Sequence, residues 1–319
     1  NKETQRAAEA IRAKRLFEYE TGKHHLDLSS AHKASFFEYF QEVTDQKAAG
    51  SKSNYSIWVS TLKHLRQYHK LPDLTFEEVD QLFLEGFRHY LMHKARTKSG
   101  TPLSRNTQSA YFNKLRAALN QAEQERLLMD NPVRRVKVIQ GEKNKRVYLT
   151  EDEVRAMAQA ECRYDVLKRA FLFSCCTGLR WSDIHKLTWA ELEPFYGHYR
   201  IVFTQKKTSG LQYLDLNDMA MQLMGRPGKA TERIFKGLKY SAWHNMELTR
   251  WALQAGITKK VTFHSARHTF AVIQLNRGVD IYALSRLLGH SELRTTEIYA
   301  DILESRRRDA MLDFPNVLE

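Results

Sequence analysis

Apolar side chains recur every three or four positions in four successive stretches between residues 35 and 127. In the first stretch Phe36, Phe40 and Val43 have this spacing, which places them on one face of a helix. The connections between the stretches are short, as they are in a helical bundle. The pattern therefore predicts a small bundle of helices at residues 35–48, 54–70, 76–94 and 105–127.

Capping residues predict where two of these helices begin. Glu78 follows Thr75 by three residues, which is the spacing of a capping box, so the third helix is expected to start just after Thr75. Ser104 is the expected N-cap of the fourth helix, which should end near Pro132. A separate exposed helix is predicted for residues 3–20, which are rich in Ala, Glu, Arg and Lys.

A second domain is predicted to begin at another capping-box pattern, formed by Thr150 and Glu153. The basic residues before it have no helical apolar period and predict a linker. Within the second domain, residues 197–216 have β-branched and aromatic side chains on both sides of a Lys-Lys-Thr-Ser-Gly turn, which is typical of a β-hairpin. The chain is therefore expected to be mainly α, with a small β-hairpin in its second domain.

Composition narrows the class of protein. The 319 residues include 50 Lys and Arg against 37 Asp and Glu, a net charge of +13. Residues 1–140 hold 23 basic against 16 acidic side chains, so the excess is shared by both halves, and nucleic acid is the default partner. Three cysteines cannot make a disulfide framework and no apolar run could cross a membrane, so a cytoplasmic protein is expected.

Two stretches of the second domain place basic side chains at turns. Arg180 directly follows a glycine that ends an apolar helix, and Asp183, three residues later, is placed to orient it. The expected hairpin turn carries Lys206 and Lys207. Taken singly, the arginine is better explained by a surface ion pair, and the lysines by a solvated turn.

A third stretch holds two histidines and an arginine. His264 and Arg267, at i and i+3, share a helix face and can point at one anion. His268, four residues after His264, invites a zinc interpretation. However, Ser265 replaces the general-base Glu of a His-Glu-x-x-His site and no third ligand is near in sequence, so no metal site is expected.

The fourth stretch joins a histidine to a tyrosine. Gly289 is expected to end a helix, which places His290 in the following turn, and Ser291 to cap a helix that carries Tyr299. Together the four stretches supply what metal-free phosphodiester transfer needs. Arginines neutralise the non-bridging oxygens, histidines donate hydrogen bonds or move protons, a lysine protonates the leaving oxygen and a tyrosine attacks. No carboxylate cluster for two Mg²⁺ ions is apparent, and no cofactor is expected.

Over about residues 150–310 these stretches resemble the tyrosine recombinase, or phage integrase, family, in which an Arg, a hairpin Lys, a His-x-x-Arg, a Leu-Gly-His and a Tyr follow in this order. All six principal positions are filled. Lys206 stays open as an alternative for the hairpin lysine. Matched residue by residue, the resemblance implies a supporting role for Asp183 and catalytic roles for Arg180, Lys207, His264, Arg267, His290 and the nucleophile Tyr299.

The resemblance also implies an organisation: a two-domain, C-shaped clamp on DNA. The start of the chain is similar to integrases of Bacteroidetes mobile elements. The implied regions are the end of an N-terminal, arm-binding region or linker helix (1–28), a helical core DNA-binding domain (29–135), a basic linker (136–149) and a catalytic domain with a C-terminal tail (150–319).

The implied activity is site-specific recombination for the integration or excision of a mobile element, through a 3′-phosphotyrosyl link and a Holliday junction. The implied partners are double-stranded DNA, three further copies of the chain, and host architectural or directionality factors at the bacterial nucleoid; no membrane partner is expected. The tail after Tyr299 is expected to pack on a neighbouring copy through Leu303, Met311, Leu312 and Phe314.

Candidate DNA contacts lie mainly in the first domain, where cations and amides suit phosphate binding. These candidates are Lys52, Asn54, Lys63, Arg105, Asn106, Arg134, Arg135 and Lys137.

Two other functions remain open: a type IB-like topoisomerase, and a DNA-binding accessory protein that does not cleave.

Overall fold

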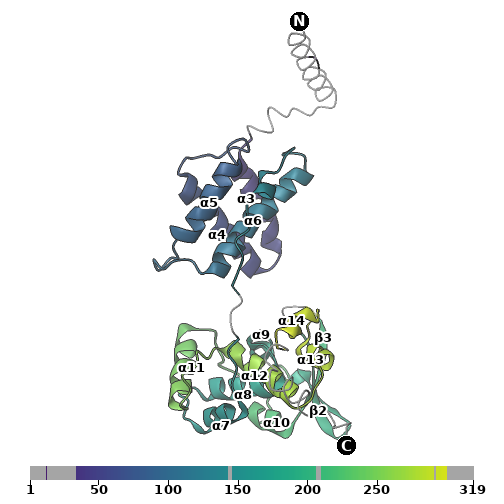
Figure 1. Cartoon of the computed structure of the whole chain (residues 1–319). Helices are drawn as coiled ribbons and strands as arrows, with labels where there is room; N and C mark the ends of the chain where they lie inside the picture. Colours follow the sequence, from purple (N-terminus) through teal and green to yellow (C-terminus); the bar gives the residue numbers. More distant parts are fainter. Residues whose placement is uncertain (1–11, 13–33, 143–145, 206–209, 291, 300–319) are drawn as a thin grey trace, which may run out of the picture. The chain divides into compact units, whose positions relative to one another are not determined.

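The computed structural model describes residues 12, 34–142, 146–205, 210–290 and 292–299. The chain divides into two compact units, residues 1–144 and 145–319, and each unit has a hydrophobic core of its own (Figure 1). Almost all of the helix predicted for residues 3–20, and the tail after Tyr299, lie outside the described residues.

The N-terminal unit is a helical bundle, as its apolar period predicts. The wholly buried rings of Phe36, Phe40, Phe87 and Phe112 form much of its core. Ser35 and Ser104 cap the first and last of these helices, because their hydroxyls accept from backbone N–H groups of the first turn. Its helices are α3 (Phe36–Gln46), α4 (Lys52–His69), α5 (Gln81–His93) and α6 (Arg105–Gln124), with 3₁₀ helices η1 (Lys47–Ala49) and η2 (Pro132–Arg135).

The predicted start of the third helix is wrong. Thr75 does donate to Glu78 through both its N–H and its hydroxyl, at 2.8 Å each, but the two residues form a turn. The backbone there pairs with the segment before α3, where the N–H of Phe76 donates to Ala34. Helix α5 begins five residues further on, because Asp80 accepts from the N–H of Phe83 and caps it.

The segment predicted as a linker is anchored at both ends. Val136 and Ile139 are buried in the core of the N-terminal unit, and Leu149 is buried in that of the C-terminal unit. Asn106, at the start of α6, exchanges two hydrogen bonds with the backbone of Glu142. The apolar residues of this segment therefore pack although they follow no helical period.

The C-terminal unit is helical with one small antiparallel sheet, of strand order β1-β2-β3. The capping box of Thr150 and Glu153 is present at the start of α7, as predicted. The elements are α7 (Glu151–Gln159), α8 (Asp165–Thr177), α9 (Trp181–Lys186), η3 (Trp189–Glu191), β1 (Leu192–Phe195), β2 (His198–Thr204), β3 (Leu211–Leu216), α10 (Asp218–Met224), α11 (Ala242–Gln254), α12 (Phe263–Asn276), α13 (Ile281–Leu288) and α14 (Arg294–Glu297).

The predicted hairpin is confirmed as β2 and β3, whereas β1 was missed. β1 has only four residues and contains Pro194, so it lacks an alternating pattern that the sequence could reveal. Helix α12 packs against α8 within this unit (Figure 1). None of the described helices is long and apolar enough to span a membrane.

Candidate functional site

Arg267 is a buried cation at the centre of the C-terminal unit. It lies on α12 and is only 2% exposed. Its Nη1 donates to the carbonyl of Gly178, at the end of α8, and its Nη2 donates to that of Leu288, the last residue of α13, each at 2.7 Å. Arg267 therefore keeps its charge among neutral acceptors supplied by the ends of two other helices.

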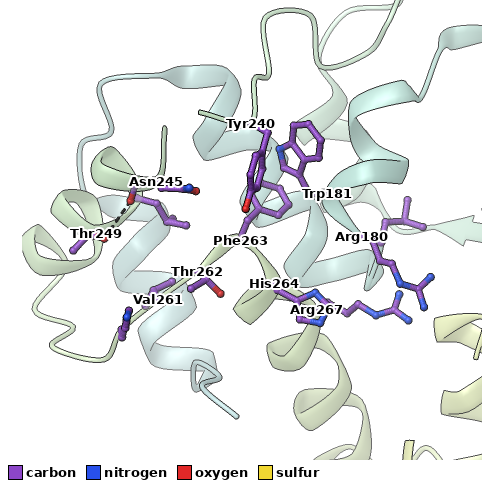
Figure 2. A pocket seen from close by; sticks show the side chains of 13 residues that line it. Arg180, Trp181, Tyr240, Asn245, Thr249, Val261, Thr262, Phe263, His264 and Arg267 are labelled. Carbon is purple, nitrogen blue, oxygen red and sulfur yellow. Dashed lines mark hydrogen bonds between the residues drawn. The ribbon is translucent and has the colours of Figure 1, made fainter. Parts of the chain in front are cut away.

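Arg180 reaches the same place from the start of α9. Its Nη1 donates to Oε1 of Gln205 at 2.9 Å, and Nε2 of Gln205 donates to the carbonyl of Leu288 at 3.2 Å. Because that carbonyl also accepts from Arg267, one peptide group connects the two guanidinium groups. Figure 2 shows Arg180, Arg267 and His264 at one end of a pocket.

The hydrogen bonds that hold the two arginines come from uncharged acceptors. Burial lowers the pKa of both, and in Arg267 the repulsion from Arg180 adds to burial and brings the pKa to about 9. Asp183, which is fully buried on α9, acts in the opposite direction on both groups. Both guanidinium groups are charged at neutral pH, so an anion between them would be strongly stabilised.

His264 lies on the exposed side of this arginine pair. It is the second residue of α12, one turn before Arg267, and lines a pocket of about 450 Å³. The pocket is bounded on its far side by α11 and by the aromatic rings of Trp181 and Tyr240 (Figure 2). The i, i+3 spacing thus places His264 and Arg267 where one anion can contact both.

His290 occupies the turn after α13, as the sequence predicts. Its Nε2 is 3.0 Å from Nη2 of Arg267 and its Nδ1 is 2.7 Å from the hydroxyl of Thr296. Arg267 can only donate, so Nε2 accepts and the ring hydrogen is on Nδ1. The imidazole is thereby fixed at both nitrogens beside the guanidinium group.

Two glycines allow these close approaches. Gly178 and Gly289 have φ values of +70° and +61°, which favour glycine. A Cβ atom on Gly178 would lie 2.6 Å from the ring of Phe270, and one on Gly289 would lie 2.2 Å from Nε2 of Gln205. The hairpin base can therefore reach the end of α13 only because residue 289 has no side chain.

Tyr299 lies close to this cluster but is itself buried. It is 2% exposed, packs among apolar side chains of α12 and α13, and its hydroxyl is 2.7 Å from Nδ1 of His268. Burial raises its pKa, although Arg267, Arg146 and Arg180 act to lower it. The hydroxyl is thus protonated and within the electrostatic field of both site arginines.

The predicted helix for Tyr299 is wrong. Helix α14 starts at Arg294 with Leu293 as its N-cap, and Tyr299 occupies the turn after it. No side-chain hydrogen bond caps the start of this short helix. Ser291, expected as the cap, and both Lys206 and Lys207 lie outside the described residues.

Two residues of the cluster were not selected from the sequence as site residues. Gln205 follows Ile201 and Phe203 at alternate positions, and all three are buried, so the strand period places a polar side chain on the inward face. His268 was considered only as a zinc ligand. No cluster of three or more His, Cys, Asp or Glu side chains suited to a metal occurs in the described ranges.

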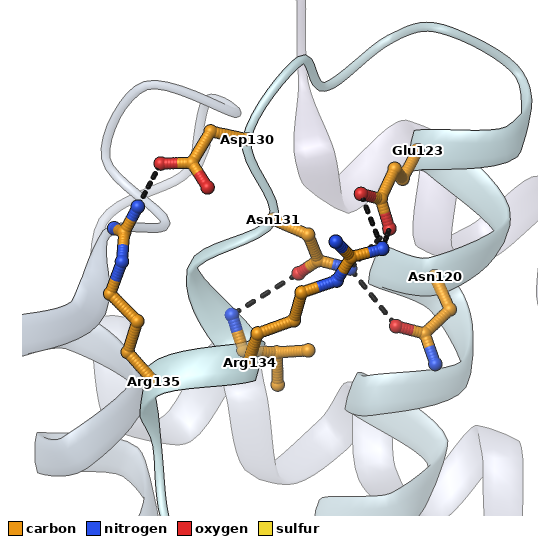
Figure 3. Close-up of polar contacts among 7 residues, drawn as sticks. Asn120, Glu123, Asp130, Asn131, Arg134 and Arg135 are labelled. Carbon is orange, nitrogen blue, oxygen red and sulfur yellow. Dashed lines mark hydrogen bonds and ion pairs between the residues drawn. The ribbon is translucent and has the colours of Figure 1, made fainter.

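The candidate DNA contacts differ in what they touch. Arg134 is paired with Glu123 at 2.8 Å and Arg135 with Asp130, next to the hydrogen bond between Asn131 and Asn120 (Figure 3). Asn54 accepts from Lys114, while Arg105 and Asn106 donate to backbone carbonyls of the segment after η2. The remaining three are exposed: Lys52, Lys63 and Lys137.

Family models match both units. The phage integrase SAM-like domain matches residues 35–138, and the phage integrase family matches residues 147–306. The chain belongs to the phage integrase family. It is a site-specific DNA recombinase, an enzyme of the tyrosine recombinase type.

Individual family members are similar to most of the chain. Tyrosine recombinase XerD of Shewanella oneidensis is 26% identical, over 81% of this chain and 89% of the relative. The integrase of Escherichia phage 186 is 27% identical, over 68% of this chain and 61% of the relative. Similarity to integrases of Bacteroidetes elements stays a prediction.

Solved structures of other integrases share the fold. The Tn1549 transposon integrase, in complex with transposon right end DNA, superposes with a TM-score of 0.67 at 17% identity, covering 86% of this chain and 99% of that one. A lambda integrase dimer bound to a COC′ core site gives a TM-score of 0.66 at 18% identity, covering 93% and 86%.

Proposed function

We propose that this integrase-family enzyme cleaves DNA by attack of Tyr299 on a scissile phosphate held by Arg180 and Arg267. The observation that carries the proposal is the buried arginine pair, which is fixed by neutral acceptors and lies beside two histidines and the tyrosine. The acceptors of these hydrogen bonds are uncharged, and Asp183 offsets part of the positive charge of the pair. A phosphodiester in the transition state gains extra negative charge and is the anion such a pair stabilises best.

The other site residues have distinct proposed roles. His264 and His290 donate hydrogen bonds to the phosphate oxygens, which requires His290 to turn its Nε2 from Arg267 toward the phosphate and to carry a hydrogen there. Asp183 holds the arginines in place. Lys207, or Lys206 in its stead, protonates the leaving 5′-oxygen. The product is a 3′-phosphotyrosyl ester, which conserves the bond energy for rejoining.

Strand exchange follows from the same chemistry in reverse. A 5′-hydroxyl of a partner duplex attacks the phosphotyrosyl ester, and two such exchanges pass through a Holliday junction to integrate or excise a mobile element. We propose a homotetramer on two DNA sites, joined by the tails after Tyr299, with host architectural or directionality factors. The enzyme would act in the cytoplasm, at the nucleoid.

Both units are proposed to contact the duplex, and the net charge of +13 supports this. Exposed Lys52, Lys63 and Lys137 have no partner among the described residues that a phosphate would need to displace. For the paired Arg134 and Arg135, a phosphate would have to replace a carboxylate. Affinity should fall steeply with salt, because most contacts are to phosphates.

The experiment that tests this function is covalent trapping. A pool of nicked duplexes with a randomised centre is incubated with the enzyme and with EDTA, and duplexes that stay attached in detergent are selected and sequenced. Tyr299→Phe should bind the selected duplex as wild type does but form no adduct. Tyr282→Phe, an exposed tyrosine of α13, is the matched control and should form the adduct normally.

Three outcomes separate the alternatives. An adduct formed by Tyr299→Phe would mean that another residue is the nucleophile. An adduct with wild type but no joining of two matched duplexes would favour the topoisomerase function. Tight binding with no adduct would favour the accessory protein.

A further inference from the structure

We infer that His268 is a catalytic residue, whose Nδ1 takes the phenolic proton as Tyr299 attacks the scissile phosphate. The inference rests on the proposed function, in which Tyr299 is the nucleophile. It adds a group, at hydrogen-bond distance from the tyrosine hydroxyl, that makes this hydroxyl reactive.

The contact between the two side chains is direct. Nδ1 of His268 lies 2.7 Å from the hydroxyl oxygen of Tyr299, within the range at which a proton can be transferred. Both residues are buried, at 6% and 2% exposure, so water does not compete for the hydroxyl. His268 follows Arg267 directly on α12, and one rigid helix therefore carries both a phosphate-binding cation and the proton acceptor.

The protonation states fit a transfer in this direction. Burial lowers the pKa of His268 to about 3, so the imidazole is neutral at physiological pH. Burial also raises the pKa of Tyr299, so the phenol keeps its proton until attack. A neutral imidazole facing a protonated phenol can accept its proton through Nδ1, with the ring hydrogen then on Nε2.

Positive side chains near His268 make its basicity depend on whether a phosphate is bound. His264, Arg146 and Arg267 each lower the pKa of His268 by repelling a positive imidazolium. A phosphodiester bound at Arg180 and Arg267 would offset that repulsion, because its negative charge stabilises the imidazolium. His268 is therefore a weak base in the free enzyme and becomes a stronger one when DNA is in place.

In the cleavage step one bond to phosphorus forms, another breaks, and two protons move. The lone pair of the Tyr299 hydroxyl oxygen forms the new bond to phosphorus, and its proton passes to Nδ1 of His268. The bond from phosphorus to the 5′-oxygen breaks, and that oxygen leaves with the electron pair and takes a proton from the proposed hairpin lysine, Lys207 or Lys206. In the rejoining step the directions reverse, and His268 returns its proton to the departing Tyr299 oxygen.

His268→Asn is the informative substitution, because the Asn amide oxygen can accept the hydrogen bond but cannot take the proton. Cleavage of the selected duplex at saturating DNA should fall about 100-fold, as expected for loss of a general base. Wild-type affinity in a gel-shift measurement would show that the variant is folded. His268→Gln serves as a second variant if the first does not fold.

A modified duplex distinguishes the base from the acid. When sulfur replaces the 5′-bridging oxygen, the thiolate leaves without a proton. Lys207→Ala should then recover most of its cleavage rate, whereas His268→Asn should stay slow. Recovery of His268→Asn on this duplex would overturn the inference.

Fluorotyrosine at position 299 gives an independent measurement. Fluorine makes the phenol more acidic, so the defect of His268→Asn relative to wild type should shrink as fluorines are added. A defect that is unchanged would mean that His268 only positions the ring, and a rate within about threefold of wild type would remove any role. The proposed function would fail separately, through absence of a wild-type adduct or its persistence in Tyr299→Phe.

Discussion

Two pairs of arginines in this molecule are held in opposite ways. Arg134 and Arg135, in the N-terminal unit, lie at the surface, and each is paired with a carboxylate. Arg180 and Arg267, in the C-terminal unit, are half-buried and fully buried, and they donate to carbonyl and amide oxygens. The carboxylates neutralise the first pair, whereas the second pair keeps its positive charge.

The difference shows which arginines are suited to act on an anion. Surface ion pairs contribute ~0–1 kcal/mol each to stability, and their cations are already satisfied. Burying guanidinium groups without full compensation costs free energy, which the fold tolerates through hydrogen bonds to two helix ends and to the side chain of Gln205. Under the proposed function, a phosphate bound between Arg180 and Arg267 would offset that cost.

The largest effect should come from removing a buried arginine. Arg267→Ala should reduce the rate of covalent adduct formation ~10²–10³-fold, as expected when a donor to a transition-state oxyanion is lost. The rate is measured at saturating DNA by quenching in detergent. Arg134→Ala is the matched control. Equal losses of rate in the two variants would mean that the arginines of the C-terminal unit have no special role in cleavage.

A smaller effect should follow from removing the amide that connects the arginines. Gln205→Ala leaves Arg180 without its acceptor, and cleavage should fall about tenfold, because hydrogen bonds to charged groups contribute ~1.5–3 kcal/mol. DNA affinity measured by gel shift should change less than the rate. A rate equal to wild type would mean that Gln205 fills space without orienting Arg180.

Gly289→Ala should act through the same amide. Its Cβ atom would displace the end of Gln205, so cleavage should fall by a similar factor, and adding it to Gln205→Ala should cost little more. Gly197→Ala is the control, since Gly197 also has a positive φ (+84°) but nothing lies within 4 Å of its Cβ position. If the losses of cleavage rate in the two single variants add fully in the double variant, Gly289 acts independently of Gln205.

The smallest effect is expected at the paired surface arginines. Arg134→Ala should lower the free energy of unfolding by under ~1 kcal/mol and leave the cleavage rate at saturating DNA within about twofold of wild type. The dependence of DNA affinity on salt concentration, compared between Arg134→Ala and wild type, tests whether Arg134 contacts a phosphate. If the slope of log affinity against log salt concentration is reduced by about 1, Arg134 exchanges Glu123 for a phosphate. If the slope is unchanged, Arg134 stays paired with Glu123 and does not contact DNA.

The sequence predicts the elements and the order of the site residues better than their surroundings. Helical periods, the Ser104 cap, the capping box of Thr150 and Glu153 and the β2–β3 alternation are local properties, and each is confirmed. The start of α5 was missed because pairing of Phe76 with Ala34 is a tertiary contact that no local pattern records. β1 was missed because four residues with a proline carry no period.

In the candidate site, too, the sequence predicts local spacings but not contacts between distant segments. The spacing of His264 and Arg267 on one helix could be predicted, since three residues nearly complete a turn. The carbonyls that hold Arg267 come from residues 89 and 21 positions away in the sequence, and the contact between His268 and Tyr299 spans 31 positions. Such contacts depend on how helix ends meet, which residue types alone do not specify.

Helix α13 also determines where hybrid enzymes can be joined. Its last carbonyl, at Leu288, accepts from both Arg267 and Gln205. Inserting or deleting one residue within Ile281–Leu288 would rotate that carbonyl by ~100° about the helix axis and move it ~1.5 Å along it, so both hydrogen bonds would be lost at once. Chimaeras with related integrases should therefore exchange α13 and Gly289 as one block, together with β2 and Gln205, and place their junctions in surface turns outside it.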